Sequence, residues 1–300
     1  MRRYLTSMLL VLLACGSDSS NFGNAPSGGG GVDGGNGGNP NDPGGGVTLP
    51  GGDGGTTSDA GNTTCSHTLT AVIRDFRPCV AEPNDTNCTQ ANGHLDFEHY
   101  RGNAVAKGIV GPTLSADDRT PVWASRGQTN EGSATTDAAH FADWYHTKSG
   151  VNIALERKLD LVAQANGHYV YERTEFFPID DNKAQGVTTG FGNGPKPPPP
   201  NDTIDHNFEF TTEVRLSFTY RGGETFEFYG DDDLWVFVDG KLALDLGGPH
   251  PPARDRVNMD SRGLTVGKTY SMDLFHAERH TEKSTFRVDT TIECFEPPVH

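Results

Sequence analysis

Residues 230–250 read GDDDLWVFVDGKLALDLGGPH, and they join three consecutive carboxylates to two short apolar runs. The runs at 234–238 and 241–246 are rich in the aliphatic, β-branched and aromatic side chains that favour strands. Asp239 and Gly240 separate the runs, and an Asp-Gly pair in this position is typical of a two-residue hairpin turn. The stretch therefore predicts an antiparallel β-hairpin that follows an acidic loop.

Short runs of the same kind recur on both sides of this hairpin. In one of them Val214, Leu216 and Phe218 alternate with polar residues, which is the pattern of a half-buried strand. The predicted strands outside the hairpin lie at 69–76, 169–177, 208–220, 225–229, 270–276 and 286–294.

Other kinds of element are sparse. Helical patterns are confined to 136–145 and 257–259, and the stretch 182–202 holds four consecutive prolines that no strand could absorb. Many short strands separated by Gly, Asn and Pro predict an all-β fold. We expect an antiparallel β-sandwich or barrel with long loops and little helix.

The acidic loop is the densest concentration of chemistry in the chain. Asp231, Asp232 and Asp233 repel one another, so a fold that gathers them needs either a cation or a wet loop. Hard carboxylate oxygens suit calcium, which takes six to eight oxygen ligands. Asp245 follows in the next strand and is the fourth candidate ligand, with capping of the nearby turn as its alternative role. An acidic loop that stays solvated is the alternative to a metal site.

Catalytic patterns are weak in this sequence. The three adjacent carboxylates are too crowded for the separate acid and base of a glycosidase. The segment 276–280 reads HAERH, which lacks the Glu directly after the first His that a zinc protease requires. On a strand its two histidines would lie about 13 Å apart, so we expect surface ion pairs for Glu278 and Arg279 instead. These patterns predict a binding protein and not an enzyme, with a divergent hydrolase as the least favoured alternative.

The first 15 residues have the order of an export signal. Arg2 and Arg3 precede an apolar run at 8–14, which is too short to span a bilayer. The run ends Leu-Leu-Ala-Cys and resembles the lipobox of bacterial lipoproteins, in which the cysteine, here Cys15, receives the lipid. In that family the residue after the cysteine directs sorting, and Gly16 at this position, in place of aspartate, favours the outer membrane over the inner one. A chance cysteine in an ordinary signal peptide is the alternative.

Residues 16–64 hold 18 glycines and scarcely an apolar side chain. Such a segment cannot offset its chain entropy by burial, so the sequence predicts a disordered tether. We therefore divide the chain into a lipoprotein signal at 1–15, a tether at 16–64, a folded β-domain at 65–296 and a tail at 297–300.

The folded part holds four cysteines, an even number that suits an oxidising compartment. Three pairings are open. We favour Cys79 with Cys88, which closes a short loop, and Cys65 with Cys294, which ties the two ends of the domain together. A zinc site is the alternative, but no CxxC pair is present.

The net charge is −16, and an acidic protein repels phosphate backbones. Nucleic acid is therefore excluded as an expected partner, whereas cations and neutral sugars remain compatible with the charge.

The hairpin and its surroundings resemble the fibro-slime family of bacterial surface proteins. The matching segments run in the family's order and cover about residues 65–296, essentially the whole folded part. They are 73–76, 94–98, 141–145, 176–180, 205–213, 218–250, 263–280 and 284–292.

The core of that family is similar to the protective-antigen type β-barrel. In its sugar-binding members, two adjacent aspartates at the start of this hairpin hold a calcium ion, which in turn coordinates sugar hydroxyls. The matching pair here is Asp231 and Asp232. Asp233 stands where glycine is common, and it either adds a ligand or contributes only surface charge.

The resemblance implies a lipid-anchored protein of the cell envelope, exposed on the outer membrane, that binds glycans or extracellular polysaccharide matrix with calcium in adhesion or slime association. The sugar site expected from it comprises Asp231, Asp232, Trp235 and His250, although a tryptophan in such a strand is more often part of the core. A structural surface protein with neither a metal nor a sugar site is the alternative.

Overall fold

The structure is a computed structural model, and it describes residues 65–77, 93–180, 206–280 and 283–298. The predicted signal with Cys15, the predicted tether, the predicted Cys79–Cys88 pair and the proline-rich loop at 182–202 lie outside these residues. Within the described ranges, no helix is long and apolar enough to cross a membrane.

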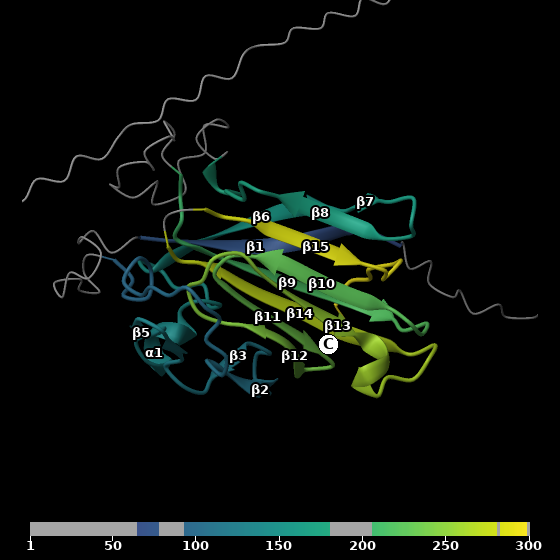
Figure 1. The fold of residues 1–300 in the computed structure, drawn as a ribbon, viewed down its shortest axis with the longest axis horizontal. Helices are drawn as coiled ribbons and strands as arrows, with labels where there is room; N and C mark the ends of the chain where they lie inside the picture. The colour runs from purple at the N-terminus through teal and green to yellow at the C-terminus, as the bar shows by residue number, and fades with distance from the viewer. Residues whose placement is uncertain (1–64, 78–92, 181–205, 281–282, 299–300) are drawn as a thin grey trace, which may run out of the picture. The chain divides into compact units, whose positions relative to one another are not determined.

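Two antiparallel sheets form most of the fold (Figure 1). The larger has the strand order β3-β2-β12-β11-β14-β9-β1-β6 and the smaller β13-β10-β15-β8-β7. The strands of the larger sheet are β1 (Thr68–Phe76), β2 (Val110–Leu114), β3 (Pro121–Trp123), β6 (Asn152–Asp160), β9 (Phe210–Thr219), β11 (Asp233–Val238), β12 (Lys241–Leu246) and β14 (Thr269–Glu278). Those of the smaller sheet are β7 (Val162–Ala163), β8 (Tyr169–Arg173), β10 (Thr225–Gly230), β13 (Ala253–Asn258) and β15 (Phe286–Thr290). A short pair, β4 (Gln128–Thr129) and β5 (Gly132–Ser133), stands apart from both sheets.

The predicted all-β sandwich is confirmed, and so is the hairpin at its centre. β11 pairs with β12 across Asp239 and Gly240, whose φ angles of 52° and 69° are both left-handed. Two left-handed residues in succession give a turn whose twist matches that of the flanking strands. The acidic loop is therefore held at the opposite end of β11 from this turn.

The helix predictions are confirmed in one place and wrong in the other. α1 (Ala138–Ala142) lies inside the predicted 136–145 segment, and the Asp137 carboxylate caps it by accepting from two backbone N–H groups. The predicted helix at 257–259 is instead the end of strand β13, followed by the 3-10 turn η2 (Met259–Arg262). Pairing of β13 with β10 satisfies the backbone there and overrides the local pattern.

The larger sheet is buried on both of its faces at its centre, where β11 and β14 lie. Its inner face and the smaller sheet enclose one hydrophobic core, to which β11 contributes Leu234, Val236 and Val238. Its outer face is covered by a second core that includes Trp235 and Phe237 from β11 and Trp144 from the segment around α1. Every residue of β11 is consequently buried, including those at its acidic end.

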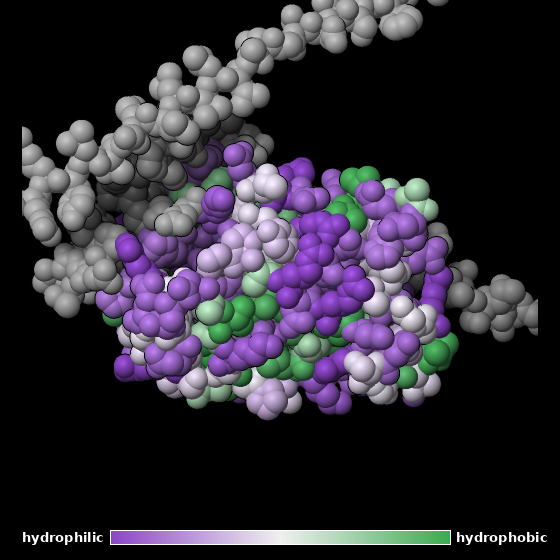
Figure 2. Space-filling view, viewed as in Figure 1, coloured by the Kyte–Doolittle hydropathy of each residue, from purple (hydrophilic) through white to green (hydrophobic). Residues whose placement is uncertain are grey.

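The smaller sheet differs, because its outer face is charged. Arg254 and Arg256 of β13 both pair with Glu227 of β10. Figure 2 shows predominantly hydrophilic side chains over β10, β13 and β15 on this side of the protein. The segment at 93–151, called the covering segment below, buries the outer face of the larger sheet, whereas the outer face of the smaller sheet is charged.

The disulfide between Cys65 and Cys294 is present, with its Cα atoms 5.0 Å apart. It joins the residue three positions before β1 to a residue shortly after β15, as predicted for a link between the ends of the domain. A zinc site that uses these two cysteines is thereby excluded.

Candidate functional site

The acidic loop is a sharp connection between the two sheets. β10 ends at Gly230 and β11 begins at Asp233, so Asp231 and Asp232 alone bridge them. A side chain at Gly230 would collide with the backbone carbonyl of Thr285, and Asp232 has a left-handed φ of 53°. Asp232 therefore adopts a backbone conformation that non-glycine residues seldom occupy and that often marks functional sites.

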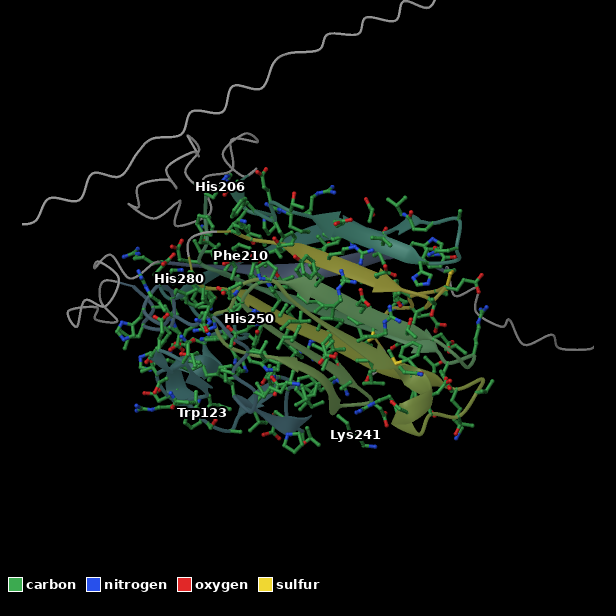
Figure 3. The ribbon with its side chains drawn as sticks, in the orientation of Figure 1. Trp123, His206, Phe210, Lys241, His250 and His280 are labelled. Carbon is green, nitrogen blue, oxygen red and sulfur yellow. A yellow bond between two sulfur atoms is a disulfide. The ribbon has the colours of Figure 1, made fainter. Side chains whose placement is uncertain are left out.

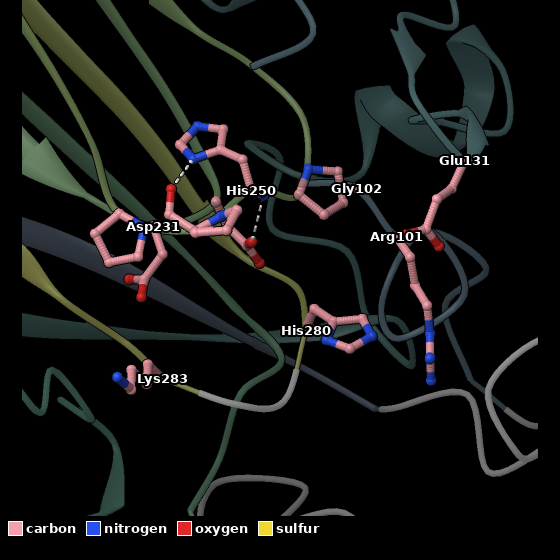
Figure 4. Close-up of a pocket in the computed structure, with 11 residues that line it drawn as sticks. Arg101, Gly102, Glu131, Asp231, His250, His280 and Lys283 are labelled. Atoms are coloured by element: carbon pink, nitrogen blue, oxygen red, sulfur yellow. Dashed lines mark hydrogen bonds between the residues drawn. The ribbon is translucent and has the colours of Figure 1, made fainter. Parts of the chain in front are cut away.

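This connection forms one wall of a pocket with a volume of about 310 Å³. Its other walls come from the segment after β12, from the loop after β14 and from the covering segment (Figure 4). Besides the two aspartates, the lining includes Arg101, Glu131, His250, His280 and Lys283. Figure 3 places His250 and His280 at one end of the strands, with Lys241 of the hairpin turn far from them.

The two aspartates of the connection are buried, and each is held by backbone amides. The Asp231 carboxylate accepts a hydrogen bond from the Thr285 N–H. The Asp232 carboxylate accepts one from His250 N–H at 3.2 Å and one from Arg279 N–H at 2.8 Å. These bonds fix both carboxylates at the pocket wall.

Burial raises the pKa of both groups. It raises the pKa of Asp231 to about 7, with the neighbouring Asp232 charge as a further cause. It raises the pKa of Asp232 to about 6, and the charge of Asp233 acts in the same direction. Desolvation disfavours the charged form of a carboxylate, so a cation placed beside these two groups would stabilise their ionised forms.

Glu278, at the end of β14, is a third buried carboxylate in the same place. It is fully buried, and neither of its carboxylate oxygens has a hydrogen-bond partner among the described residues. Burial raises its pKa well above the usual range, and the charges of Asp232 and Asp231 raise it further. Sequence reasoning placed Glu278 on the surface, and that expectation is wrong.

The expectation that Asp233 serves as a metal ligand needs correction, because this carboxylate forms a buried ion pair. Arg279 Nε donates to Asp233 Oδ2 over 2.7 Å, and both side chains are 0% exposed. The other Asp233 oxygen accepts from Gly248 N–H. Asp233 does not line the pocket.

Arg279 was expected in surface ion pairs, and this expectation is also wrong. Its Nη1 donates to the carbonyl oxygens of Asp96 and Ala134, and its guanidinium carbon lies 4.6 Å from the centre of the Trp144 ring. The arginine thereby ties the acidic connection to the covering segment. The signal that could have revealed it is the alternation along β14, which puts Arg279 on the same face as Phe275 and Ala277.

Asp245 and Trp235 are not part of the pocket, so their predicted roles need correction too. The Trp235 side chain is 0% exposed and packs within 6.2 Å of the Trp144 ring, which leaves no face for a sugar. Its Nε1 donates to one oxygen of Asp245, and Gly108 N–H donates to the other. The carboxylate of Asp245 therefore orients the core tryptophan.

His250, predicted as a sugar-binding residue, lies in the pocket wall. Its two ring nitrogens face the carbonyl oxygens of Pro251 and Leu246, at 2.8 and 3.4 Å. Its backbone exchanges hydrogen bonds with Asp232 in both directions. The ring is thus held by its own loop, and its main contribution is to brace Asp232.

The fit of this site to calcium rests on its donor set. Asp231, Asp232 and Glu278 supply the hard carboxylate oxygens that calcium requires. All three are buried, and burial disfavours their negative charge. Among the described residues, no three acidic, His or Cys side chains are already grouped as metal ligands. Backbone carbonyl oxygens and ligand hydroxyls would have to complete the six to eight ligands that calcium takes.

The fold and the pocket define a two-sheet β-domain in which an acidic connection directly precedes the central hairpin. Residues 163–294 match the PA14 domain family, and this part of the chain is a PA14 domain. The expected protective-antigen type core is thereby confirmed. Membership of the fibro-slime family stays a prediction.

Curated relatives come from Dictyostelium discoideum. The chain is 39% identical to protein psiD over 230 residues, which are 76% of this chain and 42% of psiD. It is 38% identical to protein psiC over 213 residues, which are 67% of this chain and 39% of psiC. The chain thus spans less than half the length of these relatives.

A solved structure described as the PA14 sugar-binding domain from an RTX adhesin is also similar to this chain. The alignment covers 77% of this chain and 94% of that domain, with 8% sequence identity and a TM-score of 0.29.

Proposed function

We propose that this chain is a lipid-anchored surface protein whose PA14 domain binds carbohydrate through a calcium ion held by Asp231 and Asp232. The observation that carries the proposal is a group of three buried carboxylates: Asp231 and Asp232, which line the pocket, and Glu278, whose charge interacts with both of them. Their pKa values are all raised by burial, and Asp231 and Asp232 open onto a cavity of about 310 Å³.

The charges around the acidic connection are unequally balanced. Arg279 neutralises Asp233, whereas Asp231, Asp232 and Glu278 form no ion pair with any residue that the structure describes. Isolated buried carboxylates are costly, and proteins meet that cost by protonation or by a bound cation. A divalent cation at the pocket wall would offset the excess negative charge, and calcium, once bound, can coordinate sugar hydroxyls.

Carbohydrate is the ligand class that we infer for this pocket. The resemblance to sugar-binding PA14 domains points to it, and an acidic protein with a polar pocket is compatible with it. Asp231 and Asp232 lie side by side in one wall, an arrangement that suits shared coordination of one ion. We therefore propose binding without hydrolysis.

Calcium titration by calorimetry tests the metal site. We expect saturable binding at one site in the purified protein and its loss in an Asp231→Asn, Asp232→Asn double variant, which keeps shape and removes charge. Asp239→Asn is the matched control, because Asp239 is exposed in the hairpin turn and asparagine tolerates its left-handed φ. Calcium should also raise the melting temperature of the wild type and of this control.

A glycan screen in calcium and in chelator then tests the ligand class. Sugars that bind only with calcium would support the proposal, and measured turnover of any bound glycan would contradict binding without hydrolysis. No calcium heat and no melting shift would favour the alternative, a structural surface protein. One observation favours that alternative: both oxygens of Asp232 already accept backbone N–H groups.

The anchor is a separate part of the proposal. Cys15, in the lipobox-like end of the export signal, would carry the lipid and place the protein at the outer membrane of a cell envelope. Expression with a radiolabelled or alkyne fatty acid should label the wild type and leave a Cys15→Ala variant unlabelled. Equal labelling of both would contradict it.

A further inference from the structure

Three cations near the pocket form no ion pair with any of the described residues. Arg101 Nε is buried without a hydrogen-bond partner, and Arg101, Arg126 and Lys283 make no ion pair within the described part of the chain. Several arginines elsewhere on the surface do pair with carboxylates, as Arg254 does with Glu227. A buried, unsatisfied guanidinium nitrogen is costly unless a ligand or water completes it.

Arg101 occupies a special place among them, because it lines two pockets. The first is the pocket at the acidic connection, and the second, of about 340 Å³, is lined by His99, Tyr100 and Arg126 as well. Figure 4 shows Arg101 and Lys283 on opposite sides of the first pocket, with His280 between them. Glu131 lines both pockets and is the carboxylate that could compete for Arg101, yet it makes no ion pair with it.

The charge of the pocket depends on whether the metal is bound. Without it, Asp231, Asp232 and Glu131 outnumber the cations Arg101 and Lys283. A bound calcium ion adds two positive charges and reverses that balance. Only the calcium-loaded pocket is then electrostatically suited to an anion.

We propose that the carbohydrate bound in this pocket is an acidic one, a hexuronic acid unit of a polysaccharide, whose carboxylate is held by Arg101 with Lys283 on the opposite side. The inference rests on the proposed calcium-dependent sugar site. Ring hydroxyls and the carboxylate of a hexuronic acid lie on different edges of one ring, so a single unit offers separate groups to the aspartate side of the pocket and to Arg101. The planar guanidinium matches a carboxylate in two parallel hydrogen bonds, which lysine cannot reproduce.

The second pocket extends the argument to the neighbouring sugar. Because Arg101 stands in the wall shared by both pockets, a chain that leaves the first pocket past Arg101 enters the second beside Arg126. A polymer with a carboxylate on successive units would meet a cation in each. Oligomers should accordingly bind more tightly than single units.

The test compares matched sugars by calorimetry with the full protein in calcium. The probes are the methyl glycosides of glucuronic, galacturonic and mannuronic acid, each beside the methyl glycoside of its parent hexose. We expect at least one uronide to bind about tenfold more tightly than its hexose partner, because hydrogen bonds to charged groups are stronger than neutral ones. Raised sodium chloride should reduce that preference.

Variants assign the preference to Arg101. Arg101→Gln should weaken uronide binding far more than hexoside binding and so bring the two affinities together, and Arg101→Lys should restore only part of the preference. Lys241→Gln is the control, since it removes an exposed charge at the far end of the hairpin (Figure 3). Melting temperatures in parallel establish that each variant is folded.

The outcomes separate this inference from the function beneath it. Calcium-dependent hexose binding without a uronide preference, or a preference that survives in Arg101→Gln, would overturn the inference and leave the sugar site intact. Failure of every glycoside to bind in calcium would overturn both.

Discussion

The guanidinium of Arg279 and the carboxylate of Asp233 form an ion pair in which both side chains are fully buried, with Nε 2.7 Å from Oδ2. Asp233 is the first residue of β11, and Arg279 directly follows the neighbouring strand β14. The arginine also donates through its backbone N–H to Asp232 and through Nη1 to carbonyl oxygens of the covering segment. One side chain thereby fixes the pocket wall to the second core.

Removal of Arg279 should be strongly destabilising. Arg279→Met leaves Asp233 buried without its cation, and breaking a buried pair in this way costs about 3 to 5 kcal/mol in the free energy of unfolding. Urea denaturation measures the loss. Arg254→Met is the matched control, because Arg254 pairs with Glu227 at a half-exposed position and should cost about 1 kcal/mol or less. Equal losses in the two variants would contradict the role assigned to Arg279.

The part of this arrangement that sequence could predict is the hairpin. The limits of β12 coincide with the predicted run, because two apolar runs and an Asp-Gly turn all favour the same register. β6 and β13 were missed, and both lie at sheet edges, where charged residues replace a clear apolar alternation.

Alternation along β14 assigns Arg279 to the face of Phe275 and Ala277, but local pattern alone does not show that this face, or the one that carries Glu278, is buried. β14 is buried on both faces only because the segment at 93–151 covers the outer face of the larger sheet. That segment has short strands and one short helix, so its position depends on tertiary contacts. Asp231 and Asp232, predicted as metal and sugar ligands from their place before the hairpin, do line a pocket, whereas their hydrogen-bond partners come from distant segments.

A pH effect on stability should come from His94. This ring is buried, its Nδ1 accepts from the Asp96 N–H, and its Nε2 faces the His140 carbonyl oxygen at 3.1 Å, which together define a neutral ring. Burial lowers its pKa from 6.5. The unfolded chain therefore takes up a proton below about pH 6.5 that the native state refuses, so the stability due to the neutral ring is present above that pH and is lost as pH falls.

His94→Gln removes this titration. Between pH 7 and 5 the wild type should lose more unfolding free energy than the variant, by up to about 1.4 kcal/mol for each pH unit. Urea denaturation at several pH values gives the comparison. His146 is the control of opposite sign: burial acts to lower its pKa, but hydrogen bonds to the Ala142 carbonyl and to Asp118 raise it overall. Parallel pH curves for wild type and His94→Gln would contradict the prediction.

The Cys65–Cys294 disulfide should contribute to stability through the long chain that it closes, since the cysteines are 229 positions apart. A Cys65→Ser, Cys294→Ser variant should lose about 3 to 5 kcal/mol, because the cross-link restricts the unfolded chain. Denaturation of the wild type with and without reductant supplies the matched measurement. Peptide mapping without reduction tests the predicted Cys79–Cys88 pair in the same sample. An unchanged denaturation midpoint in the double variant would contradict the stabilising role.

Gly102 tests whether the pocket depends on close packing between the covering segment and the loop after β12. An added Cβ at Gly102 would lie 2.5 Å from the carbonyl oxygen of Pro249 and 3.0 Å from Thr129 side-chain atoms. The backbone at Pro249 must then move, and His250 must move with it. Because His250 donates the N–H that holds Asp232, this shift also disturbs the Asp232 carboxylate.

Gly102→Ala should therefore lower stability by about 1 to 3 kcal/mol, as overpacking does, and weaken calcium binding through displacement of Asp232. Gly111→Ala is the control, because its added Cβ would meet Val122 only at ordinary contact distances of 3.6 Å and beyond. Denaturation and calcium calorimetry on both variants separate the two effects. A Gly102→Ala protein as stable as the wild type would mean that Pro249 yields without cost. Intact calcium affinity in a destabilised variant would mean that Asp232 keeps its place without His250, so that the pocket wall is set by Arg279 and Thr285 alone.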